Sequence, residues 1–391
     1  MRAGLTFLII AYCLSQFFRA FLAVLAPVLR GELGTTTEDL STASGLWFAA
    51  FALMQLPVGW ALDTLGPRRT AASLFLLGAA GGCVVFATAQ GPGGIILAMG
   101  LIGMGCAPIL MSTYYIFARN FSAAVFGTLA GITVGVSSLG NLLSAAPLAW
   151  VVSELGWRET LWLAAGFTLL IGLGIFAFVR DPAKPEGEAH GSFVELLRIR
   201  ALWPIYVGMF VCYAPSAGIR GLWISPYVSD IFGATLQQVG FATLAMGLAM
   251  VAGNILYGVA DRLMPSRKWS IVAGNLAVAA LLLTFYLLPP ASFAIAVAMF
   301  VAIGTFGASY PAVMAHGREF LPHHLTGRGV SLLNLFGMGG AGVMQFASGP
   351  TYAGLRETLG SEAAYGALLA ILSAAILLGL AAYVFSKERP A

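Results

Sequence analysis

The chain has 391 residues, of which 59% are hydrophobic and only 9% are charged, and its formal net charge is +4. A soluble domain carries about 25% charged residues, so this composition cannot coat a water-facing surface and excludes a soluble globular protein. The 48 glycines lie among apolar residues, as in helices that pack closely in lipid. The four cysteines fall in apolar runs without metal-ligand spacing, and we therefore expect no metal and no cofactor.

Apolar segments long enough to cross a bilayer recur along the whole chain. A spanning helix needs about 20 apolar residues, and twelve segments meet this length. The first one follows Arg2 like a signal peptide, but it continues to about Val28 without a small-residue cleavage site, so we interpret it as a helix. In chain order the predicted helices span 5–29, 41–62, 70–89, 93–117, 124–152, 160–179, 202–229, 236–260, 269–289, 291–315, 327–353 and 363–385.

One polar, proline-bearing stretch divides these helices into two sets of six. We predict an N-terminal six-helix bundle over 1–180, a cytoplasmic linker over 181–200 and a C-terminal six-helix bundle over 201–391. The two halves also repeat in sequence, because Asp63 and Asp261 lie 198 residues apart after the second helix of each half. An offset of six helices indicates parallel repeats related by an axis along the membrane normal.

The positions of Lys and Arg predict the orientation. With the N-terminus inside, fifteen of the 20 basic residues fall in cytoplasmic segments and three on the opposite side. Positive charge accumulates in cytoplasmic loops, so we expect a multi-pass protein of the cell membrane, a bacterial inner membrane, with both termini cytoplasmic. The remaining two basic residues, Arg19 and Arg220, lie inside predicted helices 1 and 7.

The loop after the second helix carries a motif. Residues 59–69 read GWALDTLGPRR, which places Gly59, Asp63, Gly66, Arg68 and Arg69 in the pattern Gly-x-x-x-Asp-(Arg/Lys)-x-Gly-x-(Arg/Lys)-(Arg/Lys). Only Thr64 departs from it, since a basic residue is usual there. A degenerate copy follows helix 8, with Asp261 and Arg262 followed by Arg267 and Lys268, and its glycine, Gly258, is one residue late.

This motif, together with the two sets of six helices, resembles the major facilitator superfamily over the whole chain. The resemblance implies two pseudo-symmetric six-helix bundles around a central cavity, which transport a solute by alternating access. It also implies a gating role for the motif, in which Asp63 lies near the cytoplasmic end of a neighbouring helix 5 or near the basic residues of the loop and holds the halves in one state. The alternative is that the arginines only set topology. The residues assigned to gating are Gly59, Asp63, Gly66, Arg68, Arg69, Asp261 and Arg262.

The two intramembrane arginines are the sharpest signal for a substrate. Each costs at least about 2.5–3.5 kcal/mol to insert. All sixteen acidic residues fall at predicted helix ends or in loops, which favours an anionic substrate as the counter-charge. The planar guanidinium fork suits carboxylates and other oxyanions. The alternative is that helix carbonyls and water satisfy each arginine. Superfamily branches that carry small anions resemble this chain in using intramembrane basic residues.

Polar and aromatic residues follow these arginines at helical spacing and predict a polar face. Tyr12 and Gln16 precede Arg19, and Tyr213, Ser216, Trp223 and Tyr227 flank Arg220. For Asn141 and Gln345, a hydrogen bond between helices is the alternative. The other candidate lining residues are Trp47, Gln55, Tyr114, Tyr115, Asn141, Tyr310, Asn334 and Gln345.

The sequence thus predicts a non-enzymatic secondary active transporter of a small organic anion, carboxylate in type, that binds to Arg19 and Arg220. We expect a monomer in the lipid bilayer, with a proton or sodium as a possible coupling ion and no nucleic acid. One alternative is proton-driven efflux of amphiphilic drugs, but the proline and membrane acid typical of that class are absent. A membrane enzyme or non-transporting sensor is the other alternative, and no acid/base set, metal spacing or output domain supports it.

Overall fold

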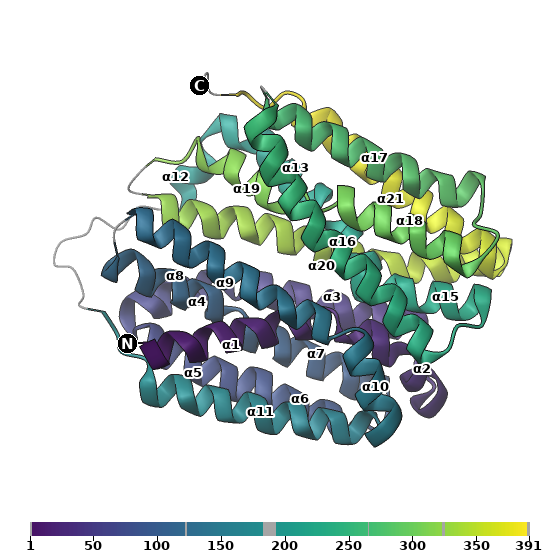
Figure 1. Cartoon of the computed structure of the whole chain (residues 1–391), viewed down its shortest axis with the longest axis horizontal. Helices are drawn as coiled ribbons and strands as arrows, with labels where there is room; N and C mark the ends of the chain where they lie inside the picture. Colours follow the sequence, from purple (N-terminus) through teal and green to yellow (C-terminus); the bar gives the residue numbers. More distant parts are fainter. Residues whose placement is uncertain (1, 122, 183–192, 265, 323–324, 389–391) are drawn as a thin grey trace. The chain divides into compact units, whose positions relative to one another are not determined.

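The computed structural model describes residues 2–121, 123–182, 193–264, 266–322 and 325–388, and within them it contains helices and no strands (Figure 1). The chain divides into two compact units, Met1–Ala189 and His190–Ala391. Among the described residues, ten helices are long and apolar enough to cross a membrane, or twelve if each of two bent pairs is one span. The predicted all-α fold of twelve membrane helices is confirmed.

In the described part of the first unit, six spans are built from eleven α-helices and one π-helix. The described elements are α1 (Arg2–Phe18), α2 (Phe21–Leu33), α3 (Thr37–Leu53), α4 (Gln55–Thr64), α5 (Pro67–Leu74), the π-helix η1 (Phe75–Ala80), α6 (Gly81–Ala87), α7 (Pro92–Cys106), α8 (Pro108–Asn120), α9 (Ala123–Leu143), α10 (Ala146–Leu155) and α11 (Trp157–Phe178).

The second unit repeats this plan after a short helix that lies within the predicted linker. Its described elements are α12 (Phe193–Leu197), the 3₁₀-helix η2 (Arg200–Leu202), α13 (Trp203–Cys212), α14 (Ala214–Gly218), the π-helix η3 (Ile219–Trp223), α15 (Ile224–Phe232), α16 (Leu236–Leu263), α17 (Arg267–Leu287), α18 (Phe293–Phe306), α19 (Tyr310–Arg318), α20 (Thr326–Leu359) and α21 (Ser361–Tyr383).

Two predicted spans are not the continuous helices that the sequence suggests. The first, predicted over 5–29, bends by 45° between α1 and α2, and the fifth, predicted over 124–152, bends by 42° between α9 and α10. Pro147 lies in the first turn of α10, and a proline inside a helix removes one backbone hydrogen bond. At the first break the amide of Ala20 bonds the carbonyl of Phe17 three residues earlier, and no proline lies at the turn.

The helix that opens each repeat's second span begins with the same cap. Thr36 and Thr235 are N-caps whose hydroxyls accept the amides of Asp39 and Gln238, and these side chains accept the threonine amides in return. Such reciprocal capping boxes fix where a helix starts. The two caps therefore start the second and eighth spans at equivalent positions, 199 residues apart.

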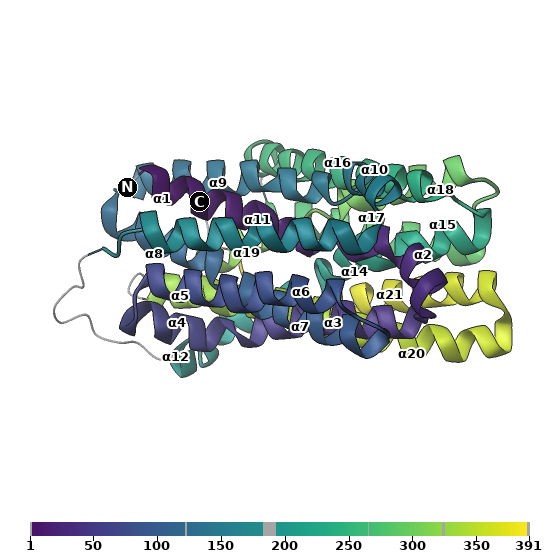
Figure 2. The same ribbon diagram turned by 90° about the horizontal axis from the view of Figure 1, so that it is seen from below.

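The same pairs of spans pack together in each unit. In the first unit α3 packs on α7, α1 on α9 and α11 on α6, while in the second α16 packs on α18, α13 on α20 and α17 on α21. Figure 2 shows α20 and α21 as neighbouring helices of the second unit. Glycines allow the close approaches, since a Cβ at Gly140 would lie 1.8 Å from the carbonyl oxygen of Cys13. Each unit is therefore a six-helix repeat with equivalent packing.

Candidate functional site

In the first unit, Arg19 lies at the break between α1 and α2, not within a continuous helix as predicted. Residues 19 and 20 form a turn, and the α2 N-cap Ala20 has φ −130° and ψ −8°. The guanidinium carbon of Arg19 lies 5.5 Å from the ring centroid of Trp47 and 5.6 Å from that of Phe51. Both distances fall within the range of a cation–π interaction.

One face of the second span carries the partners of Arg19. Trp47 and Phe51 are one helical turn apart in α3, and their rings stack with centroids 5.2 Å apart at 16°. Gln55 follows one turn later, where α4 begins, and its amide nitrogen donates to the carbonyl oxygen of Phe51 at 3.1 Å. Residues at this spacing share a helix face. Gln55 is buried on that face, with 1% of its surface exposed.

The other predicted residues of the first unit fall into two groups. Gln16 lies one turn before Arg19 in α1, and its amide nitrogen donates to the hydroxyl of Tyr12 at 3.4 Å. Both side chains are buried. Tyr115 lies instead under Arg119 of its own helix, α8, with 4.4 Å between the guanidinium carbon and the ring centroid. Its neighbour Tyr114 packs at an angle on Phe117.

In the second unit, Arg220 lies in the π-helix η3, and only 5% of its side chain is exposed. A π-helical turn is rare and frequently occurs at a functional site. Gly247 of α16 faces this side chain, because a Cβ at that position would lie 3.1 Å from Nε and 3.3 Å from Nη2 of Arg220. The absence of a side chain at Gly247 therefore makes room for the guanidinium.

A polar network joins the seventh and eleventh spans next to Arg220. The indole nitrogen of Trp223 donates to the hydroxyl of Ser348 at 3.0 Å, and that hydroxyl lies 2.9 Å from the carbonyl oxygen of Gln345. The side chain of Gln345 donates to the carbonyl oxygen of Gly218 at 3.3 Å. Gln345 thus bonds across helices to the backbone just before η3. For Gln345, the sequence leaves open a hydrogen bond between helices, and the structure contains one.

Aromatic rings pack beyond this network. Tyr227 lies edge-on to Tyr365 with centroids 5.3 Å apart, and Trp223 lies edge-on to Tyr352 at 5.3 Å. The hydroxyl of Tyr365 donates to Asp230 at 2.6 Å. Trp223 and Tyr227 are therefore members of one aromatic cluster, and its residues from α20 and α21 were missed from the sequence because they lie more than a hundred positions away.

A second cluster brings together three predicted residues from three spans. The rings of Tyr213 and Tyr310 lie 5.0 Å apart between centroids. The hydroxyl of Tyr310 donates to the side-chain oxygen of Asn334. Gly337, one turn after Asn334, leaves space for the ring of Tyr310, because a Cβ there would lie 2.9 Å from it. The structure thus joins Tyr213, Tyr310 and Asn334 within the second unit.

The motif of the first unit forms a capped helix start. Gly66 is the N-cap of α5 with φ +87°, a conformation that favours glycine. The carboxylate of Asp181, which follows α11, accepts the backbone amide of Arg68 at 2.7 Å. The guanidinium carbon of Arg68 lies 5.3 Å from the ring centroid of Phe176, also in the sixth span. Gly59 and Asp63 lie in α4, and Arg69 is exposed on α5.

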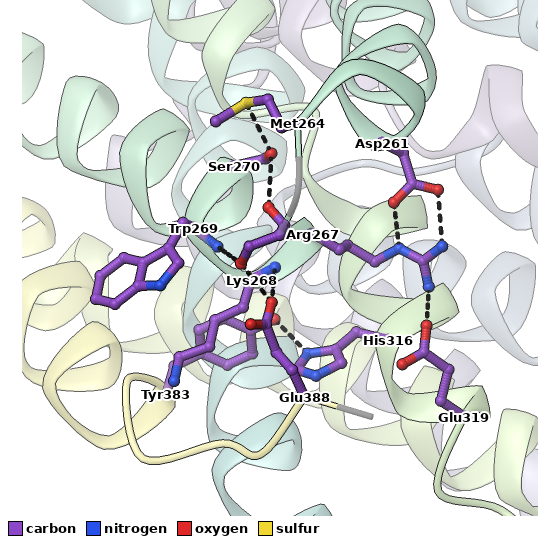
Figure 3. Close-up of polar contacts among 11 residues, drawn as sticks. Asp261, Met264, Arg267, Lys268, Trp269, Ser270, His316, Glu319, Tyr383 and Glu388 are labelled. Carbon is purple, nitrogen blue, oxygen red and sulfur yellow. Dashed lines mark hydrogen bonds and ion pairs between the residues drawn. The ribbon is translucent and has the colours of Figure 1, made fainter. Parts of the chain in front are cut away.

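The degenerate copy in the second unit is an ion-pair network (Figure 3). Nε and Nη2 of Arg267 donate to the two carboxylate oxygens of Asp261 at 2.5 and 2.7 Å, and Nη1 donates to Glu319. The carboxylate of Glu388, after α21, accepts from the amide of Lys268 at 3.2 Å and from the hydroxyl of Ser266. The side chain of Arg262, assigned to gating with Asp261, lies outside the described residues.

A histidine anchors the chain end beside this network. Nδ1 of His316 lies 2.7 Å from the hydroxyl of Tyr383, and Nε2 lies 2.9 Å from the carbonyl oxygen of Lys387. A carbonyl can only accept, so Nε2 carries a proton. His316 therefore ties α19 to α21 and to the residues after it (Figure 3). Among the described residues, no group of three His, Cys, Asp or Glu is placed to hold a metal.

The sequence pointed to some of these partners and not to others. Phe51 could have been found, because it lies one turn after the candidate Trp47. The carboxylates of Asp181 and Glu388 directly follow the sixth and twelfth spans, yet nothing in the local sequence shows that they cap the third and ninth. Glu319 likewise comes from a different span than its partner Arg267. Such contacts depend on how the spans pack.

Comparison with known proteins gives both similar sequences and a similar fold. The chain is 26% identical over 276 residues to a protein of Cupriavidus necator named "Probable sulfoacetate transporter SauU", covering 64% of this chain and 63% of that one, which is less than two thirds of its length. It is 25% identical over 262 residues to the galacturonate transporter of Dickeya chrysanthemi, covering 61% of this chain and 75% of that protein.

Among solved structures, a bacterial homolog to the human lysosomal transporter Spinster has a similar fold. It matches with a TM-score of 0.74 at 17% identity, covering 99% of this chain and 98% of that one. This likeness concerns the fold alone. The sequence model described as Major Facilitator Superfamily matches residues 8–344. The chain is therefore a multi-pass membrane protein that belongs to the Major Facilitator Superfamily.

Proposed function

We propose that this protein is a secondary active transporter of a small organic anion of the carboxylate type, and that Arg19 and Arg220 bind the anion. The observation that carries the proposal is a guanidinium on irregular backbone in the opening span of each repeat: Arg19 at a helix break and Arg220 in a π-helix. The protein moves its substrate by alternating access, as family membership leads us to expect.

The charge of the two arginines supports an anionic substrate. A guanidinium stays protonated in proteins and offers a planar set of donors that matches a carboxylate in two parallel hydrogen bonds. Arginine within a membrane span is costly, and such residues mark substrate or ion pathways. Because each repeat carries one arginine in its first span, a substrate with an anionic group and further polar groups fits better than a neutral one.

The side chains around each arginine support a polar metabolite. Tyr12, Gln16 and Gln55 lie on the spans that carry or face Arg19, and all three are buried. In the second unit, Tyr213, Tyr310 and Asn334 form one cluster. Hydroxyl and amide groups placed among apolar residues fix the orientation of a ligand. We assign these residues, together with Trp223, Tyr227, Tyr114 and Tyr115, to substrate binding.

Relatives support the same class of substrate. One is named for sulfoacetate and another for galacturonate, and both compounds carry a carboxylate. We transfer only this shared chemistry, because the first alignment covers less than two thirds of that relative. The gating role of the motif is part of the proposal: Asp63 and the Asp261–Arg267–Glu319 network hold or release the cytoplasmic ends of the spans.

The test is a binding screen on purified full-length protein. Thermal unfolding is measured with galacturonate, sulfoacetate, a neutral sugar and an amphiphilic cation, for wild type, Arg19→Ala and Arg220→Ala. We expect one or both anions to raise the unfolding temperature of wild type and neither variant to respond. Arg356→Ala, which removes an exposed arginine at the end of α20, is the control and should respond as wild type. Stabilisation only by the cation, unchanged in the variants, would instead indicate drug efflux.

A further inference from the structure

Two aromatic rings of α3 contact the guanidinium of Arg19, and they give the candidate residue Trp47 a defined role in the site. Resting on the proposed function, we propose that Trp47 is a binding residue of the anion site in two ways. Its ring, with that of Phe51, fixes the plane of the Arg19 guanidinium. Its indole N–H donates a hydrogen bond to the bound anion.

The geometry of the aromatic platform, defined as Trp47 and Phe51, supports the first role. The guanidinium carbon of Arg19 lies at almost the same distance from both rings, 5.5 and 5.6 Å from their centroids. The two rings are nearly parallel, at 16°, with centroids 5.2 Å apart, so the guanidinium contacts both members of one stacked pair. Tryptophan is the most favourable ring for a cation, and arginine stacks well on aromatic faces.

Packing keeps this platform in place. Only 1% of Trp47 and 4% of Phe51 is exposed. Gly103 of α7 lies against the backbone of Trp47, where a Cβ would be 2.3 Å from the carbonyl oxygen. Phe48 meets the Trp47 ring edge-on with centroids 5.0 Å apart. A free arginine side chain loses much rotamer entropy when it binds, and prior orientation on a fixed surface reduces that loss.

The indole N–H of Trp47 supports the second role. It is buried, and it has no hydrogen-bond acceptor among the described residues. An indole nitrogen can only donate, and nearly all buried polar groups have a partner. A donor of this kind next to a permanently charged guanidinium is suited to an anion, because the oxygen atoms of a carboxylate or sulfonate can accept from both.

The position that corresponds to Trp47 in the second unit does not carry an aromatic residue. Gly304 of α18 approaches the carbonyl oxygen of Met246 as Gly103 approaches that of Trp47. The capping threonines give the same 199-residue register, so Met246 is the counterpart of Trp47. Methionine has neither a ring face nor an N–H donor. Arg220 faces Gly247 instead, which means that the two arginines present differently shaped surfaces to the substrate.

The experiment separates the ring from the N–H. Binding of galacturonate and of sulfoacetate to the full-length protein is measured by isothermal titration calorimetry. Trp47→Leu removes both features, and we expect Kd to rise about three- to thirty-fold, the range of a desolvated cation–π contact. Trp47→Phe keeps a ring and loses the N–H, so its Kd should lie between wild type and Trp47→Leu. Phe75→Leu removes a fully buried ring of the third span that is not among the assigned binding residues, and it should leave Kd within about twofold.

Particular results would overturn each part. Equal Kd values for Trp47→Phe and Trp47→Leu would contradict the platform, and a Trp47→Phe value equal to wild type would contradict the indole donor. In an Arg19→Ala background, Trp47→Leu should cost less than it does in wild type, because only the indole hydrogen bond remains to be lost, whereas a purely structural effect would cost the same in both backgrounds. If Arg19→Ala loses binding and Trp47→Leu does not, this inference fails while the proposed function stands. If neither anion binds wild type, or Arg19→Ala binds normally, the proposed function itself fails.

Discussion

At the scale of single residues, the two arginines have different surroundings although they lie in equivalent spans of the two repeats. Arg19 is stacked on two rings, while Arg220 lies in a π-helix against a glycine. The positions of both arginines follow from the sequence, since a charge within a long apolar run is unmistakable. Their surroundings do not, because the residues that touch each guanidinium come from another span.

Gly247 gives the sharpest prediction at this scale. A side chain there would meet the guanidinium of Arg220 at 3.1 Å, so Gly247→Val should displace it and weaken anion binding about tenfold, as overpacking of a tight contact does. Calorimetry with galacturonate and sulfoacetate measures the effect. Gly258→Ala lies on the same helix, where an added Cβ meets no atom within 4 Å, and it should bind as wild type. Equal binding by both variants would show that Arg220 does not need this space.

At the scale of elements, corresponding carboxylates cap corresponding helices. Asp181 after the sixth span accepts the amide of Arg68, and Glu388 after the twelfth accepts the amide of Lys268, which lies 200 positions after Arg68. A negative charge at a helix N-terminus is favourable because the first amides have no partner within the helix. The motif thus ties the third span to the sixth, and its copy ties the ninth to the twelfth.

The two glycines of the motif should respond differently to alanine. Gly66 has φ +87°, and a Cβ there would lie 2.8 Å from the carboxyl carbon of Asp181, so Gly66→Ala should destabilise the protein by about 1–2 kcal/mol. Gly59 is helical, and its added Cβ would meet no atom within 4 Å. Gly59→Ala should therefore be neutral or stabilise by up to about 1 kcal/mol. Thermal unfolding in detergent measures both, and a lower unfolding temperature for Gly59→Ala alone would contradict the account.

The ion-pair network of the second unit can be tested by a double-mutant cycle. Arg267 lies between Asp261 and Glu319 (Figure 3), and its side chain is 27% exposed. Charge-assisted, two-pronged pairs are stronger than simple surface pairs. We expect a coupling of about 1 kcal/mol between Arg267→Ala and Asp261→Asn in thermal or denaturant unfolding. Additive effects of the two substitutions would mean that the pair contributes nothing to stability.

At the scale of the whole molecule, the sequence predicts the repeated twelve-helix plan but not its breaks. The apolar runs and the 198-residue offset between Asp63 and Asp261 are enough to predict two repeats of six helices. Pro147 could have revealed the break before α10. The turn at Arg19 and Ala20 has no such signal, because hydrophobic length alone cannot distinguish a straight span from a bent one. Substrate-binding residues and the domain boundaries at 180 and 200 stay predictions.

Orientation is a prediction of the whole chain as well. The distribution of basic residues places both termini in the cytoplasm. An affinity tag after Ala391 should therefore be removed by added protease in inverted membrane vesicles and stay intact in right-side-out cells with intact inner membranes. A cysteine introduced at the exposed Arg356 should show the opposite accessibility to a membrane-impermeant thiol reagent. The reverse pattern at both positions would show that the protein has the opposite orientation in the membrane.

The central claim is that the arginines of the two repeats bind a transported anion. Its most direct test is exchange of radiolabelled galacturonate or sulfoacetate across proteoliposomes that contain the purified full-length protein. We expect wild type and Arg356→Ala to exchange one of these anions, and Arg19→Ala and Arg220→Ala to lose at least about 99% of that activity, as removal of a charge-paired binding group implies. Exchange that persists in both arginine variants, or that occurs only with neutral or cationic solutes, would contradict the account.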